Sequence, residues 1–386
     1  MILWQLNLRH LRAAAEIWAR GSVSRAATAV NLTQPAVTQG IARVEQLLGQ
    51  PLFERTPEGM DPLPAGCTIA ARIEAAMMHI ASPRVTMAQL RALIAFADAG
   101  SYAGASEATG LSQPSLHRAI NDLAVALRRG LLERRGKGVA LTESGRRTVR
   151  AFRLARGELE AGLAELEAIK GRETGRIVIG AMPLSRARLL PAAAAAFYAK
   201  HPEVALSIVE GSYLELVEPL RDGEIDLMIG ALRSPSPGAD LVQTPLFQDR
   251  PVIVGRKGHP LARVIADSHD GNALLHLAGF PWIVAGPGTP LRTQWERMFL
   301  SGEIPPPAVP IECGSVITIR EILIQSDFLT LLSPDQVSVE LEAGWLEQLH
   351  AAPAGLLRDI GLTTRANWRP TALQQAFVDE LHGQAA

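Results

Sequence analysis

The sequence is poor in cysteine and in long apolar runs. Its two cysteines, Cys67 and Cys313, are too far apart for a disulfide framework or a metal-ligand spacing, so both are expected to be small buried residues. The N-terminus has no charged region followed by an apolar core and a cleavage site. The most apolar stretches, such as residues 189–199, are too short to span a bilayer. These absences favour a cytoplasmic protein with no membrane partner.

The sequence also lacks the short motifs of common enzyme classes. It contains no GxSxG, HExxH, phosphate-binding loop or dinucleotide-binding fingerprint. His259 and His276 lie near no obvious nucleophile in the sequence. We therefore expect no catalysis, no cofactor and no metal site.

Net charge is nearly balanced, at −1, but its distribution is uneven. Residues 1–86 carry 8 Lys and Arg against 6 Asp and Glu, and residues 87–150 carry 10 against 5. Residues 151–386 carry 20 against 28. Positive charge therefore lies in the N-terminal part, where it favours contact with nucleic-acid phosphates. A chain of this length is expected to hold two or three domains.

Residues 8–66 recur without a gap 79 positions later, as residues 87–145. Between residues 8 and 55, 15 of 48 positions are identical at this offset, which is far more than chance gives. Gln34-Pro35, for example, becomes Gln113-Pro114. The chain therefore contains two copies of one small domain, called here the first copy and the second copy.

Each copy is predicted to fold as a helix, a tight turn and a second helix. Asn31 and Gly110 tolerate the left-handed conformation that ends a helix. Thr33 and Ser112 can accept a free backbone N–H at the start of the next helix, and each is followed two positions later by a proline that suits its first turn. This pattern is the helix-turn-helix, whose second helix enters the DNA major groove.

A stripe of buried residues and a wing complete each copy. Glycine turns at Gly59 and Gly138 follow short strand-like runs, which indicates a wing. The first wing has Glu58 and Asp61, whereas the second is basic, so the two copies are expected to contribute unequally to DNA affinity. The alternative is a pair of helical packing modules with solvated polar faces. In the first copy, the apolar stripe of the second helix is Val37, Ile41, Val44, Leu47 and Leu48. The expected DNA contacts are Thr33, Gln34, Pro35, Ala36, Thr38, Gln39, Arg43, Arg55, Ser112, Gln113, Pro114, Ser115, His117, Arg118, Arg134, Arg135 and Lys137.

Several of these segments resemble the DNA-binding domain of LysR-type transcriptional regulators. They are residues 21–27, 33–38 and 51–55, and again residues 111–115 and 141–145. The usual chain of this family has one such domain, whereas this chain has two. Residues 305–315 and 333–336 look most like the branch that includes the galactose-binding-protein regulators. The resemblance implies a DNA-binding regulator with a C-terminal effector-binding domain.

A long helix is predicted to follow the second copy. Thr142 can cap a helix that runs to about Ile169, and an apolar stripe recurs along it at three- and four-residue spacings. Such a stripe favours pairing with the same helix of a second chain, and in the LysR-type family this position is the dimerising linker helix. The alternative is that it packs onto its own domain. The stripe is Val149, Phe152, Leu159, Leu163 and Leu166.

From about residue 175 the pattern changes to alternating strands and helices, which implies a mainly parallel sheet. This part resembles the two-lobed effector domain of the family, of the periplasmic-binding-protein type II. Ligands of open α/β sheets lie beyond the carboxyl ends of the strands, and an arginine there can pair with a carboxylate. The expected effector-binding residues are Met182, Leu184, Ser185, Arg186, Arg233, Thr289, Arg292, Ser315 and Leu332.

These observations predict two tandem winged helix-turn-helix domains followed by a two-lobed α/β effector domain. The expected divisions are 1–66, 67–86 (connecting helix and linker), 87–141, 142–171 (linker helix) and 172–386, with lobe I at 172–235 and 335–386 and lobe II at 236–334. Expected partners are double-stranded DNA, a sugar or organic-acid effector, a homodimer or homotetramer, and RNA polymerase as a further candidate. An architectural DNA-binding protein, whose α/β domain serves only oligomerisation, is the alternative.

Overall fold

The computed structural model describes residues 2–56, 59–136, 138–267, 273–352 and 356–385. It divides into two compact units. Residues 1–175 form the first unit together with 203–205 and 222–224, and the other residues form the second. None of the described helices is long and apolar enough to cross a membrane.

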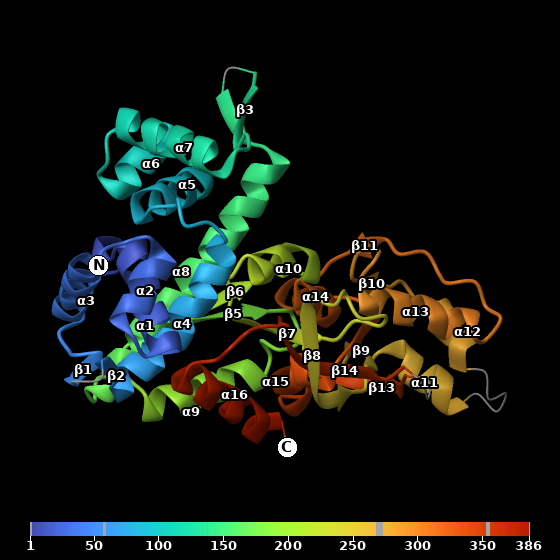
Figure 1. Ribbon diagram of the computed structural model, residues 1–386. Coiled ribbons are helices and arrows are strands. Elements are labelled where there is room, and N and C mark those ends of the chain that lie inside the picture. Colours follow the sequence, from blue (N-terminus) through green and yellow to red (C-terminus); the bar gives the residue numbers. More distant parts are fainter. Residues whose placement is uncertain (1, 57–58, 137, 268–272, 353–355, 386) are drawn as a thin grey trace. The chain divides into compact units, whose positions relative to one another are not determined.

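The first copy folds as three helices and a hairpin, followed by a fourth helix (Figure 1). A short 3-10 helix, η1 (Ile2–Gln5), precedes it. As predicted, Asn31 is left-handed, with φ 54°, and Thr33 caps the next helix through Ala36 N–H. Val37, Ile41 and Val44 are buried. The elements are α1 (Leu8–Arg20), α2 (Val23–Val30), α3 (Gln34–Leu48), β1 (Phe53–Thr56), β2 (Gly59–Pro62) and α4 (Pro64–Ile80).

The second copy repeats this arrangement at an offset of 79 residues. Gly110 is left-handed, with φ 70°, and Ser112 caps the following helix through Ser115 N–H, as predicted. Thr142 caps the last helix, which ends at Ile169 as the sequence indicated. The elements are α5 (Met87–Ala99), α6 (Tyr102–Thr109), α7 (Gln113–Leu127), β3 (Leu132–Arg135), β4 (Gly138–Leu141) and α8 (Glu143–Ile169).

α8 packs along α4 of the same chain (Figure 1). Its apolar stripe therefore belongs to the core of the first unit: Val149, Phe152, Leu159 and Leu166 are each at most 3% exposed, and Leu163 packs against that core. The expectation that a second chain covers this stripe was wrong. The spacing identified the buried face of the helix, and the α4 helix supplied by the repeat lies along α8 in place of a second chain.

The second unit contains a five-stranded sheet in the order β6-β5-β7-β14-β8. β5 and β7 are parallel, while β14 runs antiparallel to both of its neighbours, β7 and β8. The sheet is therefore mixed, because β14 runs against both of its neighbours. β5, β7 and β8 run in one direction, as the alternation of strands and helices predicted, and the reversal of β14 was not predicted. Its strands and helices are β5 (Gly175–Ala181), α9 (Leu189–Lys200), β6 (Val204–Glu210), α10 (Tyr213–Arg221), β7 (Leu227–Ala231), β8 (Leu241–Asp249), β14 (Arg358–Arg365) and α16 (Ala372–Ala385).

Two smaller sheets form the other part of this unit. β12 and β13 both pair antiparallel with β9, and β10 pairs parallel with β11. Trp282, Trp295 and Phe299 pack edge to face in the core beside them. The elements are β9 (Val252–Arg256), α11 (Pro260–Asp267), α12 (Ala273–Ala278), β10 (Ile283–Val284), α13 (Pro290–Leu300), β11 (Ile311–Glu312), α14 (Val316–Ile324), β12 (Thr330–Leu332), η2 (Pro334–Val337), α15 (Ser338–Glu342) and β13 (Leu346–Ala351).

Strand pairing differs from the expected lobe boundaries at 235/236 and 334/335. β8 was expected in lobe II, but it pairs with β14 in the five-stranded sheet. β13 was expected in lobe I, but it pairs with β9. The boundaries were inferred from the alternation of helices and strands, and that pattern does not say which sheet a strand joins.

Candidate DNA-binding surface and effector cavity

The second helix of each helix-turn-helix presents its N-terminal end to solvent. Gln34 and Gln113 stand at equivalent positions and are both exposed, as are Gln39 and Arg118. Backbone N–H groups at a helix start are unsatisfied and carry partial positive charge, which suits a phosphate or a base edge. Thr33 and Ser112 are exposed caps, so these two sequence-predicted residues also have a structural role.

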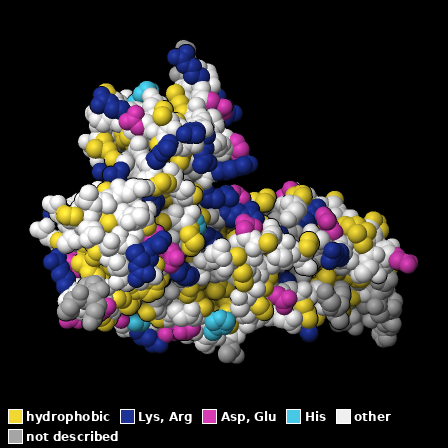
Figure 2. Space-filling view, viewed as in Figure 1, with side chains coloured by type: hydrophobic (Ala, Val, Ile, Leu, Met, Phe, Trp, Pro, Cys, Tyr) yellow, Lys and Arg dark blue, Asp and Glu magenta, His cyan; other side chains and the backbone are white. Residues whose placement is uncertain are grey.

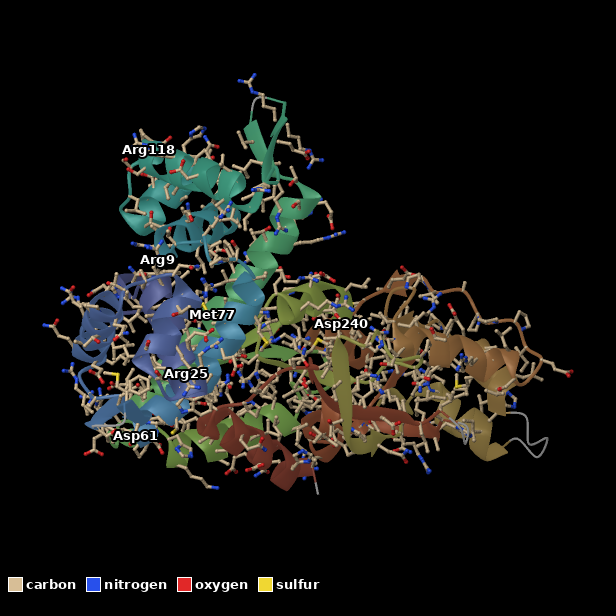
Figure 3. The ribbon with its side chains drawn as sticks, in the orientation of Figure 1. Arg9, Arg25, Asp61, Met77, Arg118 and Asp240 are labelled. Carbon is tan, nitrogen blue, oxygen red and sulfur yellow. The ribbon has the colours of Figure 1, made fainter. Side chains whose placement is uncertain are left out.

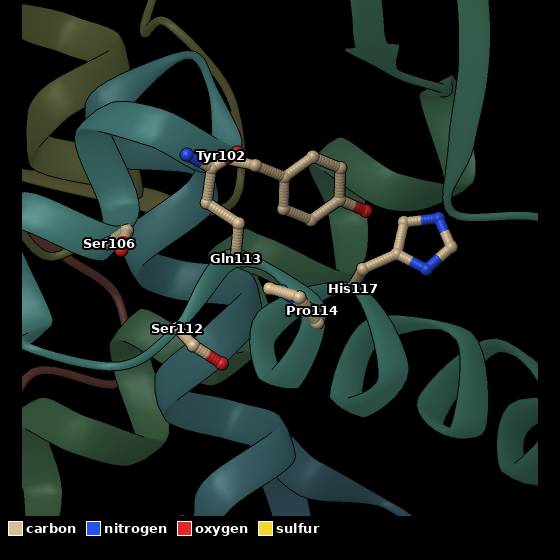
Figure 4. A pocket seen from close by; sticks show the side chains of 6 residues that line it. All are labelled: Tyr102, Ser106, Ser112, Gln113, Pro114 and His117. Carbon is tan, nitrogen blue, oxygen red and sulfur yellow. The ribbon is translucent and has the colours of Figure 1, made fainter.

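A shallow hollow of about 580 Å³ lies at the start of α7 (Figure 4). Tyr102 comes from α6 and His117 from α7, and their ring centroids are 5.4 Å apart. Asn121 Nδ2 is 3.1 Å from His117 Nδ1. Burial raises the pKa of Tyr102, so its hydroxyl stays a neutral donor at ordinary pH. The hollow is lined by Tyr102, Ser106, Ser112, Gln113, Pro114 and His117.

Positive side chains gather on the second copy. Arg134 and Arg135 on the β3–β4 hairpin are exposed, and basic residues are dense over this part of the molecule (Figure 2). Figure 3 shows Arg118 on the outer face of α7. Lys137 and Glu58, which were part of the sequence comparison between the wings, lie outside the described residues.

The first copy differs in chemistry at the matching positions. Arg43 Nη1 donates to Gln46 Oε1 at 2.7 Å, so this guanidinium is already engaged within its helix. Thr38 and Gln39 stand where the second copy has His117 and Arg118. Arg55 is exposed on β1, next to a hairpin that also carries Asp61. The two surfaces are therefore alike in fold and unlike in the side chains they offer.

A cavity of about 850 Å³ opens in the second unit, a size typical of small-molecule sites. Segments that follow β5, β6, β7, β10 and β11 line it, together with β12 and the start of β14. Of the sequence-predicted residues, the cavity brings together Met182, Leu184, Arg186, Arg233, Thr289, Ser315 and Leu332.

Two arginines of the cavity have guanidinium atoms without a partner among the described residues. Arg233 Cζ lies 4.3 Å from the centre of the Tyr213 ring, and its buried Nε makes no hydrogen bond. Burial lowers the pKa of Arg233. Arg358 donates from Nε to the buried Asp249 at 2.5 Å, while its Nη2 is buried and unpaired. Buried donors without acceptors are costly, so a ligand acceptor would satisfy them.

Other polar groups face the same cavity. Arg186 pairs with Glu210, and both side chains are partly solvated. Thr289 and Ser315 cap α13 and α14, so two helix N-termini open onto the cavity. Each of these residues therefore both caps a helix and lines the cavity. Positive helix ends beside arginines favour a negatively charged ligand.

Two sequence-predicted residues do not line the cavity. Ser185 is fully buried, and its hydroxyl donates to the carbonyl of Met182 at 2.8 Å, so the prediction was wrong because the side chain turns back into its own loop. Arg292 is also misassigned: it bonds Glu296 at 2.7 Å and lies against Trp295.

Sequence reasoning missed several lining residues. Glu210 and Tyr213 flank a β–α turn, the same signal that identified Met182, and this turn was overlooked. Arg358 begins a strand far along the chain, and no local pattern marks it. Cys313 also lines the cavity and Cys67 is exposed, so the expectation that both cysteines are buried was wrong.

Comparison with known proteins identifies both parts of the chain. The model described as "LysR substrate binding domain" matches residues 170–386. The model described as "Bacterial regulatory helix-turn-helix protein, lysR family" matches residues 8–67 and again residues 87–146. Both copies of the repeat are thus recognised separately.

Curated relatives agree with these matches. The HTH-type transcriptional regulator GalR of Pseudomonas putida is 31% identical over 373 residues, which cover 93% of this chain and 92% of that protein. The SDS degradation transcriptional activation protein of Pseudomonas sp. is 33% identical over 284 residues, covering 72% of this chain and 89% of its own length. The resemblance to the galactose-binding-protein regulator branch stays a prediction.

Solved structures show the same fold. A full-length OxyR variant from Pseudomonas aeruginosa has a TM-score of 0.57 at 22% identity, covering 77% of this chain and 98% of that one. Full-length LysG from Corynebacterium glutamicum, solved with bound effector Arg, has a TM-score of 0.56 at 21% identity, covering 77% and 96%. The chain belongs to the LysR family of bacterial transcriptional regulators, DNA-binding proteins rather than enzymes.

Proposed function

We propose that this regulator responds to a small organic acid bound in the cavity of its second unit. The observation that carries the proposal is the pair of unsatisfied guanidinium atoms, Arg233 Nε and Arg358 Nη2, in one cavity. A carboxylate accepts from an arginine in a charge-assisted hydrogen bond, the strong kind. A neutral sugar would leave the positive charge of Arg233 without a counter-charge.

The rest of the cavity wall supports an acid with an apolar body. Met182, Leu184, Leu291 and Leu332 supply apolar surface beside the arginines. Such walls hold the carbon skeleton while a few polar groups fix its orientation. The ligand can change DNA binding only by favouring one arrangement of the protein over another, typically by about 1–3 kcal/mol.

For DNA, we propose that α3 and α7 enter the major groove and that the two hairpins contact phosphates. The exposed starts of both helices, the hollow beside His117 and the basic β3–β4 hairpin support this assignment. Phosphate contacts fix position, and the side chains at the helix starts supply base recognition. RNA polymerase remains a candidate partner, and self-association would have to use surfaces other than the buried stripe of α8.

The effector proposal is tested by thermal-shift titration of the full-length chain. The panel contains small carboxylic acids, such as benzoate, succinate and citrate, and neutral sugars of similar size. A ligand that binds the folded state raises the melting temperature, and the increase keeps growing with the logarithm of ligand concentration above the Kd. We expect acids, and not sugars, to stabilise the chain. Stabilisation by sugars alone would overturn the acid assignment, and stabilisation by neither class would favour the architectural alternative.

Variants of two arginines then locate the site. Arg233→Gln should weaken binding of an active acid about 10- to 100-fold, because one charge-assisted hydrogen bond contributes about 1.5–3 kcal/mol. Arg292→Gln is the matched control, since Arg292 belongs to the same unit but does not line the cavity. Equal affinities in the two variants would place the ligand elsewhere.

A further inference from the structure

The last helices of the two copies are equivalent in sequence and are paired in space. α4 begins at Pro64 and α8 at Glu143, 79 positions later, as do all the preceding elements of the two copies. α8 continues past Leu159, the equivalent of the end of α4, to Ile169. α4 and α8, the last helices of the two copies, thus bury their apolar faces against each other within one chain.

The two helices run in opposite directions. Lys170 Nζ, just after α8, donates to the carbonyl of Leu48 at 2.8 Å. Gly66, in the first turn of α4, lies against the carbonyl of Leu52. The end of α8 is therefore beside the hairpin of the first copy, where α4 starts. Antiparallel pairing of equivalent helices is the arrangement that a twofold-related pair of subunits would adopt.

The middle of the pair is closely packed and electrostatically matched. Arg72 on α4 is 6% exposed and bonds Glu158 at 3.1 Å and Glu165 on α8. A Cβ at Gly162 would lie 3.1 Å from Cβ of Arg72 and 3.4 Å from Cγ1 of Ile69. A larger residue at Gly162 would need the neighbouring side chains to shift by a few tenths of an ångström, so the glycine favours this close approach, and the ion pair fixes the register of the two helices.

Both copies also share one hydrophobic core. The buried residues from Leu3 in η1 to Leu166 in α8 form a single cluster. Arg91 of the second copy lies over the ring of Trp4, 5.7 Å from its centre. Pairing of the copies is thus part of the fold of the first unit.

We propose that one chain is a complete two-headed reader of DNA, in which α3 and α7 bind two half-sites of one duplex without a second chain. Paired helix-turn-helix units read half-sites about one helical turn apart, roughly 34–36 Å, or a multiple of it. Because Thr38 and Gln39 of the first copy correspond to His117 and Arg118 of the second, the two half-sites differ in sequence. The operator is therefore bipartite and not a palindrome. This rests on the proposed DNA contacts of α3 and α7.

The first experiment asks whether α4 and α8 pair within one chain. In the full-length protein with Cys67→Ser and Cys313→Ser, the changes Arg72→Cys and Gly162→Cys put two thiols at the closest point of the pair. Disulfides need Cβ atoms about 3.5–4.5 Å apart, which a small relaxation of this contact provides. We expect oxidation to give a cross-linked single chain on a denaturing gel. A covalent dimer would overturn the proposal.

If the double-cysteine variant folds poorly, an exchange of charges between Arg72 and Glu165 tests the same pairing of α4 with α8. Arg72→Glu and Glu165→Arg should each weaken DNA binding, and the two changes in one chain should restore it. A mixture of the two single variants should not recover, because each chain must supply both partners. Recovery in the mixture would show pairing between chains and overturn the proposal.

The second experiment reads the operator itself. Full-length chain selects duplexes from a random-sequence library, and we expect two unlike half-sites. His117→Ala with Arg118→Ala should relax selection in one half, and Gln39→Ala with Arg43→Ala in the other. A palindrome relaxed equally in both halves would overturn the two-headed reader. Unchanged selection in both variants would instead overturn the proposed DNA contacts.

Discussion

Arg72 on α4 bonds Glu165 on α8 across 93 positions of sequence, and through this contact the two helix-turn-helix copies are tied together. Burial by itself lowers the pKa of Arg72, but hydrogen bonds with Glu165 and Glu158 outweigh that effect and raise it. The charge therefore stays on the guanidinium, and the pair is a fixed element of the first unit.

Replacing Arg72 should destabilise the first unit strongly. Arg72→Met removes the guanidinium that bonds the partly buried carboxylates of Glu158 and Glu165, and breaking a buried pair costs about 3–5 kcal/mol. The exposed i,i+4 pair of Arg20 with Glu16 is the control, since Arg20→Met should change stability by less than about 1 kcal/mol. Urea denaturation followed by circular dichroism measures both, and equal losses of stability in the two variants would contradict this role of Arg72.

The second copy should contribute more of the DNA affinity than the first. Arg134→Gln with Arg135→Gln should weaken binding to all sequences and flatten the salt dependence by roughly one unit for each phosphate that the protein no longer neutralises. Removal of the His117 and Arg118 side chains should weaken binding more than removal of the Gln39 and Arg43 side chains. The reason is that the Arg43 guanidinium already donates to Gln46 within its own helix. Gel-shift titrations at several salt concentrations would contradict the claim if the order of the two copies were reversed.

The helix-turn-helix copies could be predicted from sequence because local chemistry defines them. Helix ends are set by the left-handed backbone of Asn31 and Gly110, and helix starts by the caps Thr33 and Ser112. These are local effects of single residues, and the repeat provides the same evidence twice. The partner of α8 could not be predicted in the same way. An apolar stripe shows that a face is buried, but the choice between α4 and a second chain depends on tertiary packing.

The cavity was predictable only where strands end at helix starts. That rule found Met182 and Thr289, and the carboxyl end of β7 indicated Arg233; all three line the cavity. It failed for Ser185, whose hydroxyl is satisfied by Met182 O, and it could not find Arg358. Arg358 reaches the cavity because β14 pairs with β7 and β8, a pairing that no local pattern encodes.

Mild acid should destabilise the second unit through His259. This imidazole is 1% exposed, accepts from Leu261 N–H through Nδ1 at 3.1 Å, and lies 3.1 Å from Asp327 O through Nε2. Burial lowers the pKa of His259, so the unfolded chain takes up the proton first, and stability falls as pH drops below about 6.5. In His259→Asn the amide oxygen can still accept from Leu261 N–H in place of Nδ1. We expect this variant to be less stable than the parent at about pH 7.5. Between about pH 7.5 and 5.5, however, its free energy of unfolding should fall by about 1 kcal/mol less than that of the parent, because it has no imidazole to protonate. Parallel pH profiles of melting temperature would contradict this.

Two glycines of α8 should respond in opposite ways to alanine. A Cβ at Gly145 would lie 2.1 Å from the carbonyl oxygen of Leu131, so Gly145→Ala forces the helix start away from the hairpin, and overpacking of this kind costs about 1–3 kcal/mol. A Cβ at Gly157 meets nothing within 4 Å, so Gly157→Ala should gain up to about 1 kcal/mol from helix propensity. Gly66→Ala, 2.2 Å from Leu52 O, should repeat the destabilisation in the first copy. Urea unfolding of the three variants measures these changes. A stabilising Gly145→Ala would mean that the hairpin is not held against α8 by this contact.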